Sequence, residues 1–240
     1  MKDALVVRGL VRTFGDVRAV DGLDLVLPRG RVLALVGPNG AGKTTAMRCI
    51  AGVVPSTEGQ VEIGGVDLSA DPIGARRGLA WVPHNPQLFD ALSAWEHLAF
   101  AAAIWGTEGW EERGHALLAR FEMAERTHDA VQGFSTGMRQ KVALAAAAVH
   151  RPDLYLLDEP MNGLDPHAVR EMRRWIREEA ERGASFVLSS HLLALLDGVC
   201  TDVLVLVRGR PGFTGTIEEA KERFAGQDLE AVFFSATERA

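Results

Sequence analysis

The stretch that decides the fold is GPNGAGKTT, residues 37–45, which matches the pattern G-x-x-x-x-G-K-[ST]. An apolar run, VLALVG, leads into it and a helix-forming run, TTAMRCIAG, leads out of it. The match therefore has the strand, loop and helix that a phosphate cradle requires. Its glycines allow the backbone to turn N–H groups toward a phosphate at the start of a helix, where the helix dipole adds positive potential.

Two side chains of this loop have separate predicted tasks. Lys43, one of four lysines in the chain, bridges the β- and γ-phosphates of a nucleotide, and the Thr44 hydroxyl ligates Mg²⁺. The predicted nucleotide contacts of the loop come from Gly37, Pro38, Asn39, Gly40, Ala41, Gly42, Lys43, Thr44 and Thr45.

LYLLDEP, residues 154–160, supplies carboxylates for the same site. Its apolar residues predict a strand that delivers Asp158 and Glu159 to the carboxyl end of a sheet, where α/β folds bind ligands. We expect Asp158 to hold Mg²⁺ and Glu159 to polarise the attacking water as a general base. An Asp-Glu pair after a strand is by itself more often a solvated turn, and the upstream phosphate loop favours the functional interpretation.

The identity of the nucleotide base is less directly encoded. Guanine-specific P-loop proteins use an Asn/Thr-Lys-x-Asp motif, and no lysine of this chain sits in that setting. Adenine is therefore favoured, with Phe14 as the candidate stacking face. As a lone aromatic, Phe14 is equally consistent with a core position.

A second stretch, GFSTGMRQK at residues 133–141, also predicts a helix start that holds an anion. Two phosphate cradles in one chain need an explanation that neither motif gives alone.

The composition limits the possible functions. A net charge of −6 does not favour nucleic acid, which we do not expect as a partner. Cys49 and Cys200 lack the spacing of a zinc site or a disulfide framework. The longest apolar runs, residues 98–105 and 142–149, are far shorter than the roughly twenty residues that cross a bilayer. The N-terminus does not read as a secretory signal, so we expect a cytosolic protein.

The pattern of apolar runs predicts an α/β fold with a mostly parallel sheet. Runs that are apolar at consecutive positions suit strands covered on both faces, and helical segments lie between several of them. The opening runs have no such helices and predict a separate antiparallel layer. The predicted strands are residues 4–7, 24–27, 32–37, 61–65, 79–82, 154–158, 185–190 and 202–207.

Residues 90–150 give no strand signal and predict a helical insertion. It begins at Ser93-Ala94-Trp95-Glu96, which has the Ser-x-x-Glu form of a capping box. After residue 216, IEEAKERF and DLEAVFFSAT predict one or two short amphipathic elements before a polar terminus.

Five motifs follow one another along the chain in a fixed order: the phosphate loop, GFSTGMRQK, LYLLDEP, NGLD at 162–165 and SSH at 189–191. With this order and spacing, the chain resembles the nucleotide-binding subunit of ABC transporters over nearly all of its 240 residues. Within this family, the chain is most similar to ATPases of the ABC-2 export type, which serve drug, sodium or polysaccharide efflux and related tasks. The segments that carry this similarity are FSTGMRQK, DEPMNGLDP, SSHLL and the terminal DLEAVF.

The resemblance implies roles for single positions. Residues 37–45 match the Walker A loop, and Asp158 and Glu159 match Walker B with its catalytic glutamate. Phe14 matches the aromatic residue that stacks on adenine. Asp165 matches the D-loop aspartate, and His191 the switch histidine that contacts the γ-phosphate.

The same resemblance explains the second cradle. Ser135, Thr136, Gly137 and Met138 match the signature motif, which binds the γ-phosphate of ATP held by a second subunit. Ser135 suits the cap of the following helix, and Gly137 permits close backbone approach. A head-to-tail pair of ATP-binding subunits, expected to be a homodimer, follows.

The resemblance also implies an organisation for the chain. Residues 1–220 would form the ABC ATPase domain, with a helical subdomain at about 88–150 and a short tail at 221–240. Separate transmembrane permease subunits would hold the protein at the inner face of the cell membrane.

The helical insertion would carry the docking surface for the permease. Trp95, Trp105 and Trp110 are candidates for either core or contact.

Several positions depart from the family pattern. His84 stands where a glutamine ordinarily contacts Mg²⁺ and the attacking water, which predicts weakened hydrolysis with ATP binding retained. Gln87 would substitute only if the loop shifts. Thr136 replaces a common glycine, residues 145–148 lack a common arginine, and Met161 replaces a common threonine.

Two alternatives accompany the transporter hypothesis. A soluble ABC protein of DNA repair or translation would carry a second cassette, a long insertion or a basic tail, none of which is visible in the sequence. A regulatory cassette with weak hydrolysis is favoured by His84 and opposed by Glu159 and His191. The sequence names neither the cargo nor the partner cassette, and export rests on the resemblance.

Overall fold

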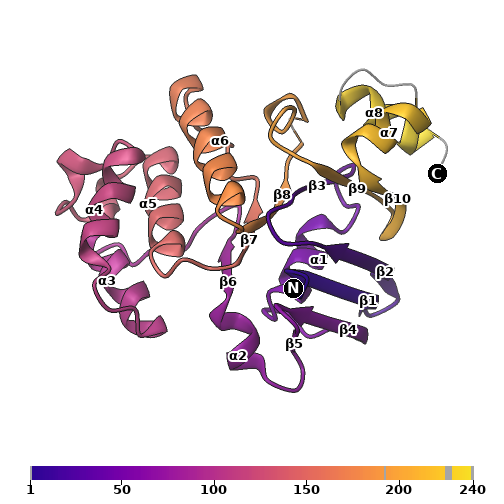
Figure 1. The fold of residues 1–240 in the computed structure, drawn as a ribbon, viewed down its shortest axis with the longest axis horizontal. Helices are drawn as coiled ribbons and strands as arrows, with labels where there is room; N and C mark the ends of the chain where they lie inside the picture. The colour runs from indigo at the N-terminus through magenta and orange to yellow at the C-terminus, as the bar shows by residue number, and fades with distance from the viewer. Residues whose placement is uncertain (1, 192, 225–228, 239–240) are drawn as a thin grey trace.

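The structure, a computed structural model, describes residues 2–191, 193–224 and 229–238. Two β-sheets lie at its centre, a helical lobe extends to one side, and a pair of C-terminal helices lies at the other end (Figure 1). Within the described residues, no helix combines the length and the apolar content that a membrane span needs.

The larger sheet confirms the predicted α/β class. Its strands are β3 (Val32–Val36), β6 (Leu79–Val82), β7 (Leu154–Asp158), β8 (Ser185–Ser189), β9 (Asp202–Val207) and β10 (Arg210–Thr216). They lie in the order β10-β9-β3-β8-β7-β6, and every neighbouring pair is parallel except β10 with β9. β3, β7 and β8 are buried at every position, as their consecutive apolar residues predict.

Strand β3 divides its side chains between two hydrophobic cores. Val32, Ala34 and Val36 belong to the core shared with the helical lobe. Leu33 and Leu35 belong to the core between the two sheets. Because side chains alternate along a strand, one five-residue run supports both layers.

The second sheet is the predicted antiparallel layer. It has the order β2-β1-β4-β5. Its strands are β1 (Leu5–Phe14), β2 (Val17–Leu27), β4 (Glu58–Ile63) and β5 (Val66–Asp67). The first two strands are longer than predicted because irregularities in their register interrupt the alternation of apolar and polar residues that marks a strand.

Strand β10 was not predicted at all. Its sequence, RPGFTGT, contains proline and glycine, which argue against a central strand. It lies at the edge of the sheet, where Pro211 pairs with Leu206 next to a register shift. An edge position tolerates the missing N–H of proline.

The predicted helical insertion contains α3 (Ala94–Trp105), α4 (Glu111–Arg120) and α5 (Thr136–Ala148), with 3₁₀ turns η1 (Ala124–Arg126) and η2 (Val131–Gly133). The capping box is confirmed: the Ser93 hydroxyl accepts from the Glu96 amide at 3.2 Å, and the Glu96 carboxylate accepts from the Ser93 amide at 2.7 Å.

The remaining helices flank the sheets and end the chain. They are α1 (Lys43–Ile50), α2 (Pro72–Arg77), α6 (Pro166–Glu181), the 3₁₀ turn η3 (Leu193–Leu195), α7 (Ile217–Phe224) and α8 (Leu229–Glu238). The domain boundary expected after residue 220 falls inside α7, and Val232 of α8 is buried in the same core as the central sheet.

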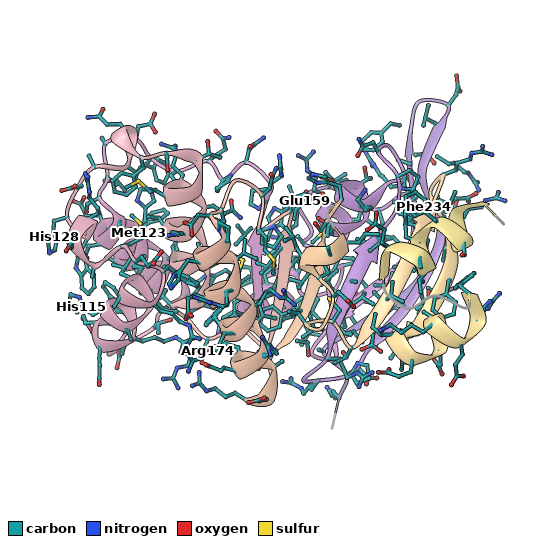
Figure 2. All side chains as sticks on the ribbon, turned by 90° about the horizontal axis from the view of Figure 1, so that it is seen from above. His115, Met123, His128, Glu159, Arg174 and Phe234 are labelled. Carbon is teal, nitrogen blue, oxygen red and sulfur yellow. The ribbon has the colours of Figure 1, made fainter. Side chains whose placement is uncertain are left out.

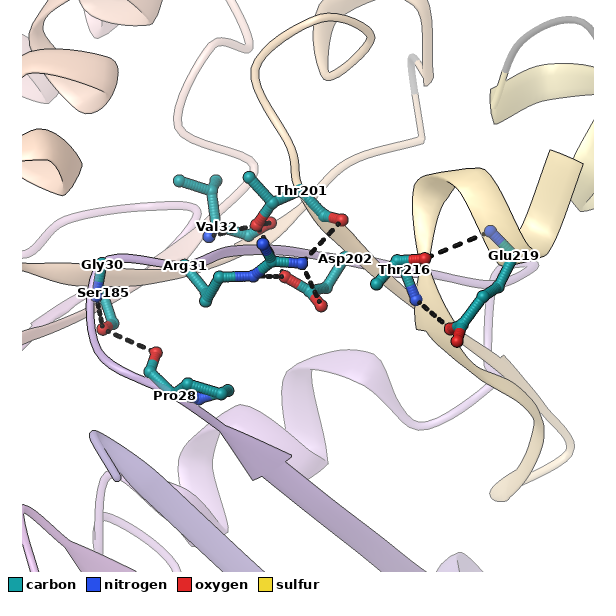
Figure 3. A network of polar contacts seen from close by, with 9 residues as sticks. All are labelled: Pro28, Gly30, Arg31, Val32, Ser185, Thr201, Asp202, Thr216 and Glu219. Atoms are coloured by element: carbon teal, nitrogen blue, oxygen red, sulfur yellow. Dashed lines mark hydrogen bonds and ion pairs between the residues drawn. The ribbon is translucent and has the colours of Figure 1, made fainter. Parts of the chain in front are cut away.

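A polar network closes the amino ends of the central strands (Figure 3). Arg31, just before β3, donates to both carboxylate oxygens of Asp202 at 2.8 and 3.0 Å. The Thr201 hydroxyl donates to Asp202 at 2.6 Å and accepts from the Val32 amide at 2.9 Å. Ser185 likewise accepts from the amide of Gly30 at 3.0 Å. These contacts fix β3, β8 and β9 at the end opposite the candidate site.

Candidate functional site

The loop at residues 37–45 connects β3 to α1 and leaves the start of the helix open. Gly42 forms the N-cap with φ +102°, and no side chain caps the helix. Gly40 also has a positive φ of +78°. Because the first amides of a helix have no partner within it, they are available to an anion.

Close packing explains two of the glycines. A Cβ atom at Gly37 would lie 2.3 Å from the carbonyl oxygen of Leu206, and one at Gly42 would lie 2.1 Å from that of Ala19. Both contacts are to backbone atoms and leave no room for a side chain. The loop is therefore held tightly against β9 and β2.

Lys43 folds back over its own loop. Its Nζ donates to the carbonyl oxygens of Gly37 at 2.7 Å and Pro38 at 3.2 Å. Burial lowers the pKa of Lys43, and the carboxylates of Glu159 and Asp158 offset part of that shift. The ammonium group thus lies where a phosphate would supply stronger negative partners than two carbonyls.

Asp158 ends β7 with both carboxylate oxygens occupied. The Thr44 hydroxyl donates to Oδ2 at 2.9 Å, and the Ser189 hydroxyl donates to Oδ1 at 2.5 Å. The side chain is 2% exposed. The sheet register makes Asp158 and Ser189 direct neighbours on β7 and β8, and the start of α1 brings Thr44 to the same point.

Glu159 follows in an unfavourable backbone conformation, with φ +53°. Its amide donates to the Ser189 hydroxyl at 2.9 Å, and its Oε2 lies 2.8 Å from Nδ1 of His191. Seen from above, Glu159 lies between the helical lobe, marked by His115 and His128, and the C-terminal helix that carries Phe234 (Figure 2). The structure therefore brings together Thr44, Asp158, Glu159 and His191, as the motifs predict.

Asp165 lies at the N-cap of α6, where it accepts from the amides of His167 at 2.9 Å and Ala168 at 3.0 Å. These backbone hydrogen bonds, the one from Ala168 first, lower the pKa of Asp165. The carboxylate thus stays charged at neutral pH and stabilises the start of the helix.

The signature residues begin α5 at a separate place. The Ser135 hydroxyl caps the helix by accepting from the Met138 amide at 3.3 Å. A Cβ at Gly137 would lie 2.9 Å from the carbonyl oxygen of Gly163, so this turn packs closely on the loop that leads to α6. Ser135 and Thr136 are exposed, and no hydrogen bond in the described chain joins them to the phosphate loop.

Phe14 is a surface residue, not a core residue. It ends β1 with 47% of its area exposed, and the Arg12 guanidinium lies 4.2 Å from the ring centre. One aromatic face is thus engaged by a cation, and much of the ring is open to a stacking partner.

His84 is exposed after β6, and the described residues give it no hydrogen-bond partner. Gln87 instead lines an apolar groove of about 650 Å³ between the sheet and the helical lobe, together with Trp105 and His150. The structure thus places Gln87 along this groove and gives no support for a shifted register.

The three tryptophans of the lobe differ. The rings of Trp95 and Trp110 contact each other in a tilted arrangement, with centres 4.6 Å apart, and pack on the core. Trp105 instead stacks on His150 at 5.1 Å and lines the groove.

The structure also shows where two of the positions that depart from the family pattern lie. Met161 is buried in the core, which suits a thioether. Ala146 and Ala147, in the alanine run that lacks the arginine, line the groove.

Ser189 is the site residue that motif reasoning missed. It lies within the quoted SSH motif, but only the register of β7 and β8 shows that its hydroxyl faces Asp158. The sequence did contain a signal for this contact: a serine ends one apolar strand, and Asp-Glu ends another strand of the same sheet.

Comparisons with known proteins agree on one family. Residues 20–162 match the family model described as ABC transporter. The chain is 33% identical over 226 residues to the ABC-type transporter ATP-binding protein EcsA of Bacillus subtilis, covering 93% of this chain and 92% of EcsA. It is 31% identical over 235 residues to the daunorubicin resistance ATP-binding protein DrrA3 of Streptomyces coeruleorubidus, covering 97% and 74% of the two chains. The structure of an ATP-binding subunit of an ABC transporter matches with a TM-score of 0.92 and 32% identity, over 97% of this chain and 99% of the other.

Proposed function

Since the chain belongs to the ABC transporter ATP-binding family, and is thus an ATPase subunit coupled to transport, we propose that it uses Mg-ATP to drive export of the ABC-2 type. The observation that carries the proposed use of Mg-ATP is the meeting of Thr44, Asp158 and Glu159 at the carboxyl ends of β3 and β7. Names of relatives such as DrrA3, given for drug resistance, favour the export direction.

The residues present suit a magnesium ion. The Thr44 hydroxyl and the Asp158 carboxylate are hard oxygen ligands that already lie 2.9 Å apart. Mg²⁺ usually takes one or two protein ligands beside phosphates and waters, so this pair is sufficient. When bound with ATP, the ion would neutralise charge on the β- and γ-phosphates.

In the proposed reaction, Lys43 moves from its loop carbonyls to the β- and γ-phosphates, and the open start of α1 binds the β-phosphate. Phe14 stacks on adenine. The oxygen of a water attacks the γ-phosphorus, its proton passes to the Glu159 carboxylate, and ADP leaves. His191, 2.8 Å from Glu159, orients that carboxylate and contacts the γ-phosphate.

We further propose that two chains, as a homodimer, close head to tail around two ATP molecules. The exposed Ser135 and Thr136 at the start of α5 would bind the γ-phosphate of the partner's ATP, with Asp165 nearby at the interface. ATP that bridges two chains stabilises the closed pair, and hydrolysis releases it. A Ser135→Ala variant should keep its own ATP affinity while the turnover of the homodimer falls.

The apolar groove offers a surface for the permease. It is lined by Trp105 and by small residues, Ala101, Ala146 and Ala147, which would admit a bulky apolar side chain of a partner. Docking there would hold the subunit at the inner face of the membrane. Copurification of a multi-span protein from detergent-solubilised membranes would support this placement, whereas a strictly ribosome-bound protein would contradict it.

Glu159→Gln tests the assignment of the base. We expect ATP affinity to stay within about twofold while turnover falls by about 100-fold or more, because a general base contributes 10²–10⁴-fold. The variant should also form a dimer at saturating Mg-ATP, seen by size-exclusion chromatography. Glu181→Gln, an exposed acid at the end of α6, is the matched control and should change neither property. Equal turnover of Glu159→Gln and wild type would remove Glu159 as the base.

A further inference from the structure

Ser189, the last residue of β8, makes contacts that the family motifs do not assign. It is 0% exposed, and the register pairs it with Asp158 on β7. Its hydroxyl donates to Asp158 Oδ1 at 2.5 Å and accepts from the Glu159 amide at 2.9 Å. One hydroxyl therefore connects the expected Mg²⁺ ligand to the backbone of the expected base.

We propose that Ser189 is a positioning residue that sets which oxygen of Asp158 serves the metal and fixes the backbone of Glu159. The inference rests on the proposed function of this site. Oδ1 is held by Ser189, so Oδ2 is the oxygen that faces the Thr44 hydroxyl. The carboxylate cannot rotate without breaking the short contact to Ser189.

The second half of the contact acts on Glu159. Its φ of +53° is unfavourable for a residue with a Cβ atom and persists only if its surroundings hold it. The Glu159 amide has two acceptors, the hydroxyl of Ser189 at 2.9 Å and the Ser189 carbonyl at 3.3 Å. The hydroxyl is the shorter contact, and its loss would free the peptide that aims Glu159 at His191.

A serine suits this position because a hydroxyl donates and accepts at once. Alanine would leave a buried Asp158 oxygen without its donor and weaken the hold on the Glu159 amide. Threonine would keep both contacts and add one methyl group.

The chain offers a matched control on the same strand. Ser185 begins β8, is also 0% exposed, and also donates and accepts through its hydroxyl. Its partners are the Gly30 amide at 3.0 Å and the Pro28 carbonyl at 3.2 Å, both at the amino end of the sheet (Figure 3). Ser185→Ala thus removes the same group from the same depth, away from Asp158.

The test compares wild type, Ser189→Ala, Ser189→Thr and Ser185→Ala in three measurements. Mn²⁺ affinity in the presence of ADP is measured by electron paramagnetic resonance, the Glu159 amide is followed by hydrogen exchange, and Mg-ATP turnover is measured at saturating ATP. Mn²⁺ stands for Mg²⁺ because both prefer oxygen ligands.

We expect Ser189→Ala to weaken Mn²⁺ binding by about tenfold or more, as loss of a partner that orients a metal ligand usually does. Exchange of the Glu159 amide should accelerate and turnover should fall. Ser189→Thr should recover most of the metal affinity. Ser185→Ala should match wild type in all three measurements even where its melting temperature drops.

Equal metal affinity and equal Glu159 exchange in Ser189→Ala and wild type would overturn the role of Ser189. Equal losses in Ser185→Ala and Ser189→Ala would also overturn it, since the effect would then be a general loss of stability. If the added methyl group prevents folding of Ser189→Thr, the comparison of Ser189→Ala with Ser185→Ala still tests the role of Ser189. A wild-type protein that neither binds Mn-ADP nor hydrolyses ATP would instead refute the proposed function.

Discussion

The two ends of the central sheet are built from the same strands and differ in how their polar groups are satisfied. At the amino ends, Arg31 donates to both carboxylate oxygens of Asp202, and Thr201 completes the network within the chain. At the carboxyl ends, Lys43 folds back on the carbonyls of its own loop, and Glu159 has φ +53°.

The two ends therefore contain two kinds of polar side chain: those whose contacts stabilise the fold, and those that would bind a ligand. Contacts complete within the chain contribute to the free energy of unfolding, so their loss lowers stability. The half-buried Lys43 ammonium is in an unfavourable state, because burial lowers its pKa, and a bound phosphate would relieve it. Substitutions at the two ends should therefore affect different measurable properties.

Lys43→Ala gives the largest expected effect. ATP affinity should fall by about 100-fold, because the variant loses charge-assisted contacts to phosphate worth about 1.5–3 kcal/mol each. Stability without nucleotide should stay the same or rise, since a half-buried charge disappears. Binding of a fluorescent ATP analogue and thermal melting measure the two quantities.

Lys221→Ala, a change of charge on α7, is the control and should leave ATP affinity unaltered. A large drop in melting temperature for Lys43→Ala would break the comparison, because Lys43 would then hold the fold as Arg31 does.

Asp202→Ala tests the amino end. The substitution removes the carboxylate that accepts from Arg31 and Thr201, so the free energy of unfolding should fall by about 1–3 kcal/mol. Urea unfolding measures the loss. ATP affinity at a temperature where the variant is folded should match wild type, and a parallel loss of ATP affinity would show that the two ends are not independent.

The same contrast explains what the sequence could predict. The phosphate loop and the consecutive apolar runs of β3, β7 and β8 follow from local chemistry, because glycines and buried strands leave direct marks on the sequence. The capping box at Ser93 is equally local. The sequence therefore sufficed for the fold class and for Asp158 and Glu159 at the end of one strand.

What the sequence could not predict depends on neighbours distant along the chain. β10 contains proline and glycine and becomes a strand only because it lies at the edge, beside β9. Ser189 acquires its contacts from the register of β8 with β7, and its partner Asp158 lies 31 residues away in sequence. The position of Gln87 along the groove also depends on packing between the sheet and the helical lobe.

His84→Gln has a smaller expected effect, confined to the carboxyl end. His84 is exposed after β6, at the position where the family resemblance implies a glutamine, so introducing the amide should raise turnover by a few-fold and leave ATP affinity unchanged. Steady-state ATPase assays and binding of a fluorescent ATP analogue measure the two quantities. Identical turnover of His84→Gln and wild type would remove any special role of His84.

The smallest expected effect is a pH dependence of stability that belongs to Lys43. Because burial lowers its pKa below the ordinary value of 10.5, the unfolded chain binds this proton more tightly than the folded chain does. The free-energy cost of the half-buried charge is fully present below the folded pKa and is relieved as pH rises through that pKa toward the unfolded value. Without nucleotide, the stability of wild type relative to Lys43→Met should therefore rise in this window, as measured by urea unfolding at several pH values. Bound ATP would favour the charged form and abolish the rise, whereas a difference independent of pH would show that the ammonium group is not in an unfavourable state.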